Sequence, residues 1–218
     1  MSTWEEQIEQ DLSWREGEIA SLKLLAASAS KDSDRQRAVL RASWAMLYAH
    51  YEGFCKFCWD LLLEAIEKEG HARDILIESL AILSLTETFK KLRGDLSSEN
   101  LWDFYSEKFN LCFKEPASFS TKLETDSNLW PNVAQANNAK AGLSCLMFET
   151  YKTELKNLVG RRNEIAHGRK LIVGDLESFQ TFENATFLVM HDLALATVEC
   201  LNKKTYLKST IPTPINSP

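Results

Sequence analysis

The sequence predicts an all-α protein built as one helical domain. Apolar residues recur three or four positions apart over most of the 218-residue chain, the period of a helix with one buried face. No alternating apolar pattern is long enough to indicate a sheet, and glycines and prolines fall between the periodic stretches. A chain of this length can bury one hydrophobic core and is short for two. We expect one domain over residues 1–206 and a disordered tail over 207–218, which holds three prolines and no apolar period.

Two long helices are predicted at the start of the chain. Thr3 and Glu6 match a capping box ahead of a helix that continues to about Ala29. Ser33 can cap a second helix, of about 36 residues, that Gly70 ends. This second helix is apolar around a wide face, so we expect several neighbours to cover it and the core to form around it.

Further helices are predicted in the rest of the chain. The pattern indicates helices over 74–93, 98–113, 143–166 and 176–201, with short helical turns and loops over 115–142. Gly168 stands where the residue after a helix is often a glycine in the left-handed conformation.

The composition is that of an ordinary globular protein. Hydrophobic residues make up 44% and charged residues 26%, which argues against intrinsic disorder. No apolar run approaches the roughly 18 to 20 residues that span a bilayer, and the acidic start MSTWEEQIEQ is unlike a signal peptide. The five cysteines form an odd set without framework spacing. We therefore expect a cytoplasmic protein with reduced thiols and no membrane partner.

Charge is unevenly distributed along the chain. The net charge of −6 argues against broad phosphate binding by the whole surface. Residues 152–170, however, carry six basic and two acidic side chains, a local net of +4, and residues 1–20 carry six acidic side chains and one arginine, a local net of −5. A local basic patch is therefore possible, beside an acidic segment of opposite sign.

The basic segment ends in RRNEIAHGRK, the stretch with the most evident chemistry. The imidazole of His167 can exchange protons near neutral pH, and the guanidinium of Arg162 offers paired donors that suit a phosphate. Asn163 lies four residues before His167, on the same helix face, where it can orient the imidazole or a substrate oxygen. The combination suits phosphodiester chemistry, although a polar helix end with basic side chains near the C-terminal dipole would also look like this.

Other chemistries find little support. No GxxxxGK[ST], GxGxxG or HExxH motif occurs, and the CxxC of Cys55 and Cys58 lies inside an apolar helix with no second pair. We expect neither a bound metal nor a cofactor.

The stretch RNEIAHG resembles the RxxxxH motif of the HEPN superfamily, all-helical domains that include many metal-independent endoribonucleases. The upstream stretch LYAHYEGFCKF, residues 47–57, resembles the second long helix of a larger prokaryotic HEPN group found in toxin–antitoxin and phage-defence settings. The resemblance implies an up-and-down bundle with a long second helix and extra helices inserted before the motif helix.

The resemblance also implies roles for individual residues. His167 would act as general acid or base, Arg162 would bind the scissile phosphate, and Asn163 would position them. Two protomers would join their motifs in one composite site, so an RNA substrate and a homodimer are implied, with a 2′,3′-cyclic phosphate as product. Six neighbours complete the expected site. We expect Arg161, Arg169 and Lys170 to contact the substrate, and Glu164 is a candidate supporting residue. Glu52 and His50 are candidate supporting residues as well, provided that the second helix lines the site; the alternative is a pair on the helix surface or a buried glutamate with one partner.

One position departs from the family pattern. HEPN toxins paired with a nucleotidyltransferase antitoxin often carry a tyrosine two residues after the histidine, where this chain has Arg169. That partnership is therefore in doubt, although a cognate antitoxin protein of another kind remains a candidate partner. The alternative to a nuclease is a HEPN-fold module that binds RNA, a nucleotide or a protein without cutting.

Overall fold

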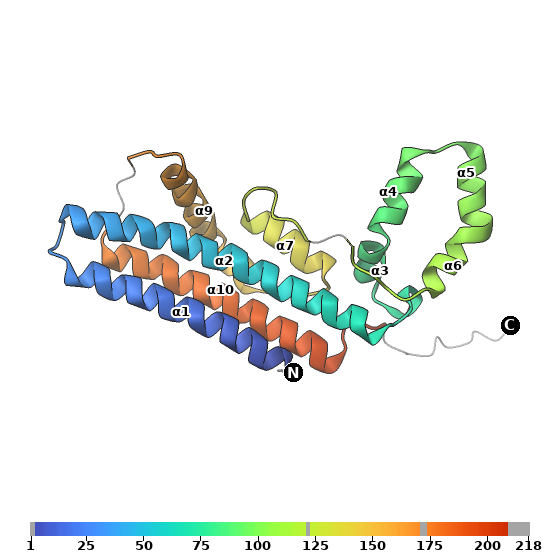
Figure 1. Ribbon diagram of the computed structural model, residues 1–218, viewed down its shortest axis with the longest axis horizontal. Coiled ribbons are helices and arrows are strands. Elements are labelled where there is room, and N and C mark those ends of the chain that lie inside the picture. The colour runs from blue at the N-terminus through green and yellow to red at the C-terminus, as the bar shows by residue number, and fades with distance from the viewer. Residues whose placement is uncertain (1–2, 121–122, 171–173, 209–218) are drawn as a thin grey trace.

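The computed structural model describes residues 3–120, 123–170 and 174–208, and all regular elements in these ranges are helices. Three long helices form the body of the protein (Figure 1). They are α1 (Trp4–Ser28), α2 (Asp34–Glu69) and α10 (Leu176–Lys203), and α9 (Lys152–Ala166) packs against α2 and α10. The predicted all-α bundle with a long second helix is confirmed.

Local sequence explains where the long helices begin and end. The Thr3 hydroxyl accepts a hydrogen bond from the Glu6 amide, and the Glu6 carboxylate accepts one from the Thr3 amide, which completes the predicted capping box. The Ser33 hydroxyl caps α2 by accepting a hydrogen bond from the Gln36 amide, and Gly70 ends the helix with a left-handed φ of 69°. The Asp175 carboxylate caps α10.

The core forms around α2, as its wide apolar face predicts. Five aromatic side chains of this helix are almost completely buried, and α1, α9 and α10 all contact it. They are Trp44, Tyr48, Tyr51, Phe54 and Trp59.

The inserted region between α2 and α9 differs from the prediction in detail. The helix expected over 74–93 is three pieces: a 3-10 turn (Arg73–Ile75), α3 (Glu78–Ser84) and α4 (Thr86–Gly94). The chain turns at Leu85, which is buried, and the hydroxyls of Ser84 and Thr86 donate to carbonyls of the preceding turn.

The next predicted helices are also subdivided. Residues 98–114 are helical as α5 (Ser98–Asp103), a π-helical turn (Phe104–Lys108) and α6 (Phe109–Lys114). The loop region contains α7 (Pro131–Lys140). The motif helix starts later than expected. The Asp192 carboxylate accepts a hydrogen bond from the Met147 amide at the start of α8 (Met147–Thr150), and Tyr151 separates α8 from α9.

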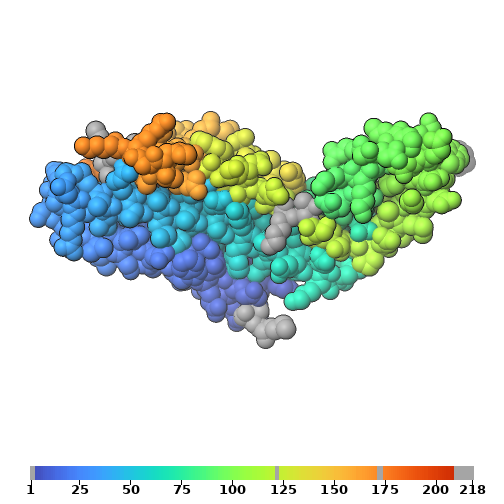
Figure 2. Space-filling model, turned by 45° about the horizontal axis from the view of Figure 1, so that its top comes forward, coloured from blue at the N-terminus to red at the C-terminus, as the bar shows by residue number. Residues whose placement is uncertain are grey.

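Helices α4 to α6 form an arm that projects from one end of the bundle (Figures 1 and 2). No residue of these helices is buried, and several large apolar side chains are exposed. They include Leu101, Trp102, Tyr105 and Leu111, and Leu96 is exposed in the loop between α4 and α5. A cleft of about 710 Å³, lined by α3, α4, α7 and the loop at 123–126, lies at the base of the arm.

The end of the chain differs from the prediction in part. Leu207 bridges to Leu76, and the Lys208 amide donates to the carbonyl of Ile75, so the first two residues of the predicted tail are held against the domain. Residues 209–218 lie outside the described residues. No helix in the described ranges is long and apolar enough to span a membrane.

Candidate functional site

The end of α9 presents His167 at the surface. Its amide continues the helical pattern by donating to the Asn163 carbonyl, 2.9 Å away. Gly168 follows with φ of 70°, and the amides of Gly168 and Arg169 donate to the carbonyls of Ile165 and Glu164. These two hydrogen bonds form a Schellman motif, whose left-handed residue would be strained if it carried a Cβ. Gly168 avoids this strain and so allows the helix to end directly after His167. The imidazole is exposed and makes no hydrogen bond or ion pair with any residue that the structure describes.

Arg162, one turn and a half earlier, is held from three directions. Its Nη1 donates to Asn128 Oδ1 at 2.7 Å and to Asn163 Oδ1 at 2.9 Å. Its guanidinium carbon lies 4.6 Å from the centre of the Tyr48 ring of α2, a cation–π distance. A guanidinium has five N–H donors, so these two hydrogen bonds leave donors for a phosphate.

The loop that carries Asn128 is fastened to α2. The Tyr48 hydroxyl accepts a hydrogen bond from the Leu129 amide at 2.8 Å, and the Thr125 hydroxyl donates to Glu52 Oε1 at 2.5 Å. Between these points Asp126 and Ser127 have φ of 48° and 71°, a left-handed conformation that non-glycine residues seldom adopt. Two strained residues in a row show that the surrounding contacts determine the path of this loop, and hence the place of Asn128.

The surroundings of Tyr48 and Glu52 on α2 reinforce the protonation states that both side chains ordinarily have at pH 7. Burial raises the pKa of Tyr48 to about 12, so the phenol is neutral at pH 7. Burial alone would raise the pKa of Glu52, but hydrogen bonds from Thr125 and Lys56 outweigh it and hold the pKa below its usual value. Glu52 is therefore a carboxylate at neutral pH, and it serves to anchor the loop rather than to exchange protons.

Of the expected substrate contacts, Arg161 packs inside the bundle. Its guanidinium carbon lies 4.3 Å from the Trp44 ring centre and 5.2 Å from that of Phe182. Burial lowers the pKa of this arginine, and its Nη1 has no hydrogen-bond partner among the described residues. This geometry favours packing between α9, α2 and α10 over contact with a substrate.

The other motif neighbours lie at the surface. Arg169 is exposed and pairs with Glu164 at 2.8 Å, and Lys170 is exposed beside it. Glu164 therefore ties the turn after His167 to the helix. Arg169 and Lys170 remain near His167 in the chain, where a substrate backbone can reach them.

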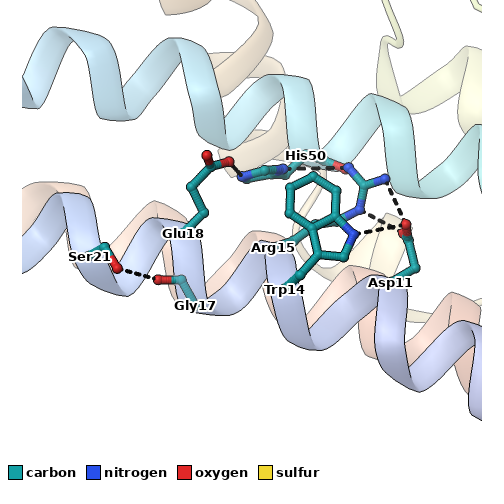
Figure 3. A network of polar contacts seen from close by, with 7 residues as sticks. All are labelled: Asp11, Trp14, Arg15, Gly17, Glu18, Ser21 and His50. Carbon is teal, nitrogen blue, oxygen red and sulfur yellow. Dashed lines mark hydrogen bonds and ion pairs between the residues drawn. The ribbon is translucent and has the colours of Figure 1, made fainter.

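His50 belongs to a different place. It lies on the side of α2 that faces α1, where its ring Nε2 is 2.9 Å from a Glu18 oxygen and its Nδ1 is 3.4 Å from Arg15 (Figure 3). Arg15 also pairs with Asp11 at 2.7 Å. Burial, and then the charge of Arg15, lowers the pKa of His50. Residues two apart on a helix point roughly 200° apart, which is why Glu52 reaches the loop and His50 does not.

Sequence reasoning missed Tyr48, Thr125 and Asn128. One signal for Tyr48 was available, because it precedes Glu52 by four residues and so shares its face of α2. No local pattern identifies Asn128, since the TDSN segment reads only as a turn.

The described residues offer neither a metal site nor a reactive thiol pair. Among the described residues, no three His, Cys, Asp or Glu side chains gather as a metal site. Cys55 and Cys58 are buried free thiols, and burial raises the pKa of both, which keeps them in the unreactive protonated form.

The protein is a helical bundle in which α9 carries the ordered Arg162 and is followed directly by the exposed His167. This arrangement places it in the class of all-α domains with an RxxxxH motif. The family model described as HEPN_MAE_28990-like HEPN matches residues 4–206. The chain therefore belongs to the HEPN_MAE_28990-like HEPN family. No curated protein matched the chain, and neither did any solved structure. HEPN domains are commonly ribonucleases.

Proposed function

We propose that the protein is a metal-independent endoribonuclease whose site is built from Arg162, Asn163 and His167. The observation that carries this proposal is that α9 holds Arg162 in a fixed position and that His167, at the end of the same helix, is exposed. Family membership supports it, because HEPN domains are commonly ribonucleases.

The proposed reaction is transesterification within the RNA strand. The ribose 2′-oxygen attacks the neighbouring phosphorus, the bond from phosphorus to the 5′-oxygen breaks, and a 2′,3′-cyclic phosphate and a 5′-hydroxyl result. A general base takes the 2′-hydroxyl proton, and a general acid gives a proton to the leaving oxygen. Arg162 would bind the non-bridging phosphate oxygens, on which charge develops in the transition state.

The need for two proton carriers supports a homodimer. The chain has four histidines, and three of them face carboxylates at 2.8–2.9 Å. They are His50, His71 and His191. One protomer thus offers a single free imidazole, whereas two protomers with facing motifs would offer one base and one acid.

Expression in cells and cleavage by purified protein test the proposal together. Wild type and His167→Ala would be induced from a tightly controlled promoter while growth and total RNA are followed, and each purified protein would then be incubated with RNA in a chelator. His191→Ala is the matched control, because this histidine is half exposed on α10 and far from the motif in the chain.

We expect wild type and His191→Ala to arrest growth and to cut RNA to cyclic phosphate ends, and His167→Ala to lose about 10²- to 10⁴-fold in rate, the usual contribution of an acid–base group. Growth arrest would support the further proposal of a toxin or defence effector, with a cognate antitoxin as partner. Equal RNA binding by all three proteins without cleavage would refute the nuclease and favour a non-catalytic binding module.

A further inference from the structure

An open groove of about 430 Å³ follows the seam between α1 and α10. The two helices run antiparallel, since Asn202 donates to Glu5 at one end and His191 lies 2.8 Å from Glu16 at the other. The floor is apolar. Ile8 and Leu12 of α1 and Ala194 of α10 form it, each less than a tenth exposed.

The α10 side of the groove leaves large apolar surface in water. Leu195 is 70% exposed, and Leu188, two turns earlier on the same face of the helix, is 46% exposed. Leucines seven residues apart form a stripe like those that partner helices cover. Leu195 lines the groove itself, and Leu188 extends the exposed apolar surface along α10 beyond the lining residues.

The α1 side of the groove is acidic. Glu5, Glu9 and Glu16 line it, within a segment of net charge −5 over residues 1–20. An apolar floor with a negative edge attracts a ligand that combines apolar and positive groups.

We propose that this groove binds an amphipathic helix of a partner protein, with an apolar stripe flanked by lysine or arginine. From Glu5 to Glu16 the groove is roughly 17 Å long at 1.5 Å per residue, which matches about three turns of helix. Binding of a helix in an apolar groove through residues three and four apart is a common mode of recognition. The proposal does not depend on the nuclease activity.

A second copy of the chain fits the groove less well. Two copies joined by a twofold axis at this groove would bring their acidic edges together. The basic segment 152–170 offers no apolar face either, because Leu155, Leu158 and Val159 of α9 are buried in the bundle.

The test uses the full chain and two fluorescent peptides of fourteen residues. Both peptides carry leucines at helical spacing, one with lysines and one with glutamates at the flanking positions, and binding is followed by fluorescence anisotropy. Leu195→Asp and Glu9→Lys alter the groove. Leu24→Asp is the apolar control, 73% exposed on α1, and Glu64→Lys is the charge control, exposed on α2.

We expect saturable binding of the lysine peptide only, weakened at least tenfold by Leu195→Asp and by Glu9→Lys and unchanged by either control. Equal loss with Glu64→Lys would show non-specific attraction to an acidic protein and would overturn the proposal, as would the absence of saturable binding. Light scattering on the protein alone gives the remaining outcome: a dimer that Leu195→Asp dissociates would make a second copy the occupant instead. Circular dichroism checks that each variant is folded.

Discussion

The hydrogen bond from Arg162 to Asn128 provides a quantitative test of the site. Asn128→Ala removes the acceptor that lies 2.7 Å from Arg162 Nη1. Hydrogen bonds to charged groups contribute about 1.5–3 kcal/mol, and since both side chains are only partly buried we expect the lower figure, about 1.5 kcal/mol. In a domain of this size that loss lowers the melting temperature by about 3–6 °C.

A double-mutant cycle attributes the loss to this contact. The free energies of unfolding of Asn128→Ala, Arg162→Ala and the double variant would be measured in urea, with Asn132→Ala, an exposed asparagine of α7, as control. We expect a coupling energy of about 1 kcal/mol between the first two substitutions and none with the control. Additivity within about 0.3–0.5 kcal/mol would refute the reasoning that the loop holds the arginine.

The same variant separates positioning from substrate contact. If Arg162 acts on the transition state, a misplaced guanidinium lowers kcat of RNA cleavage more than it raises KM. Asn128→Asp keeps an oxygen at the same place and should recover most of the rate. Cleavage by Asn128→Ala within twofold of wild type would contradict a positioning role for the loop.

Three further predictions concern the helix end, the buried histidine and the arm. Gly168→Ala should lower the free energy of unfolding by about 1 kcal/mol, because the φ of this residue is 70°. Gly160→Ala should raise it by up to about 1 kcal/mol, because Gly160 lies inside α9 and nothing lies within 4 Å of the new Cβ. Urea midpoints that shift in the same direction for both variants would contradict this reasoning. The pKa of His50 is lowered in the folded protein, so the unfolded chain binds the proton more readily and stability should fall as the pH drops below about 6.5. His50→Gln should reduce that fall between pH 7.5 and 5.5, and equal pH dependence in both proteins would rule out this histidine as its cause. Amide hydrogens of α4 to α6 should exchange much faster than those of the middle of α2, because the arm buries no side chain; equal protection would show that something covers it.

The long helices could be predicted because their signals are local. Apolar period, the Thr3–Glu6 box, the Ser33 cap and the glycine at 70 all act within a few residues, and the structure follows them closely. The breaks at Leu85 and Tyr151 could not be predicted in this way. These breaks depend on contacts with other parts of the fold. The local sequence of residues 74–93, taken by itself, predicts one continuous helix.

The motif residues of the candidate site could be predicted from the sequence, but the residues that hold Arg162 in place could not. Arg162, Asn163 and His167 stand together in the sequence, and the place of Gly168 after the helix followed from its identity. Asn128 reaches Arg162 across 34 positions, through a loop whose path depends on α2, so no local rule could reveal it. Grouping His50 with Glu52 was wrong for an elementary reason, since positions two apart lie on opposite sides of a helix.

The middle of helix α2 tolerates almost no change in length, because it makes specific contacts on two opposite sides. One side carries Tyr48 and Glu52 toward the loop that holds Asn128, and the other carries His50 toward α1. An inserted or deleted residue between these contacts and Gly70 would turn everything beyond it by about 100° and shift it by about 1.5 Å. The length of this helix is therefore under tighter constraint than its composition, and tolerated insertions should be confined to the arm and the loops.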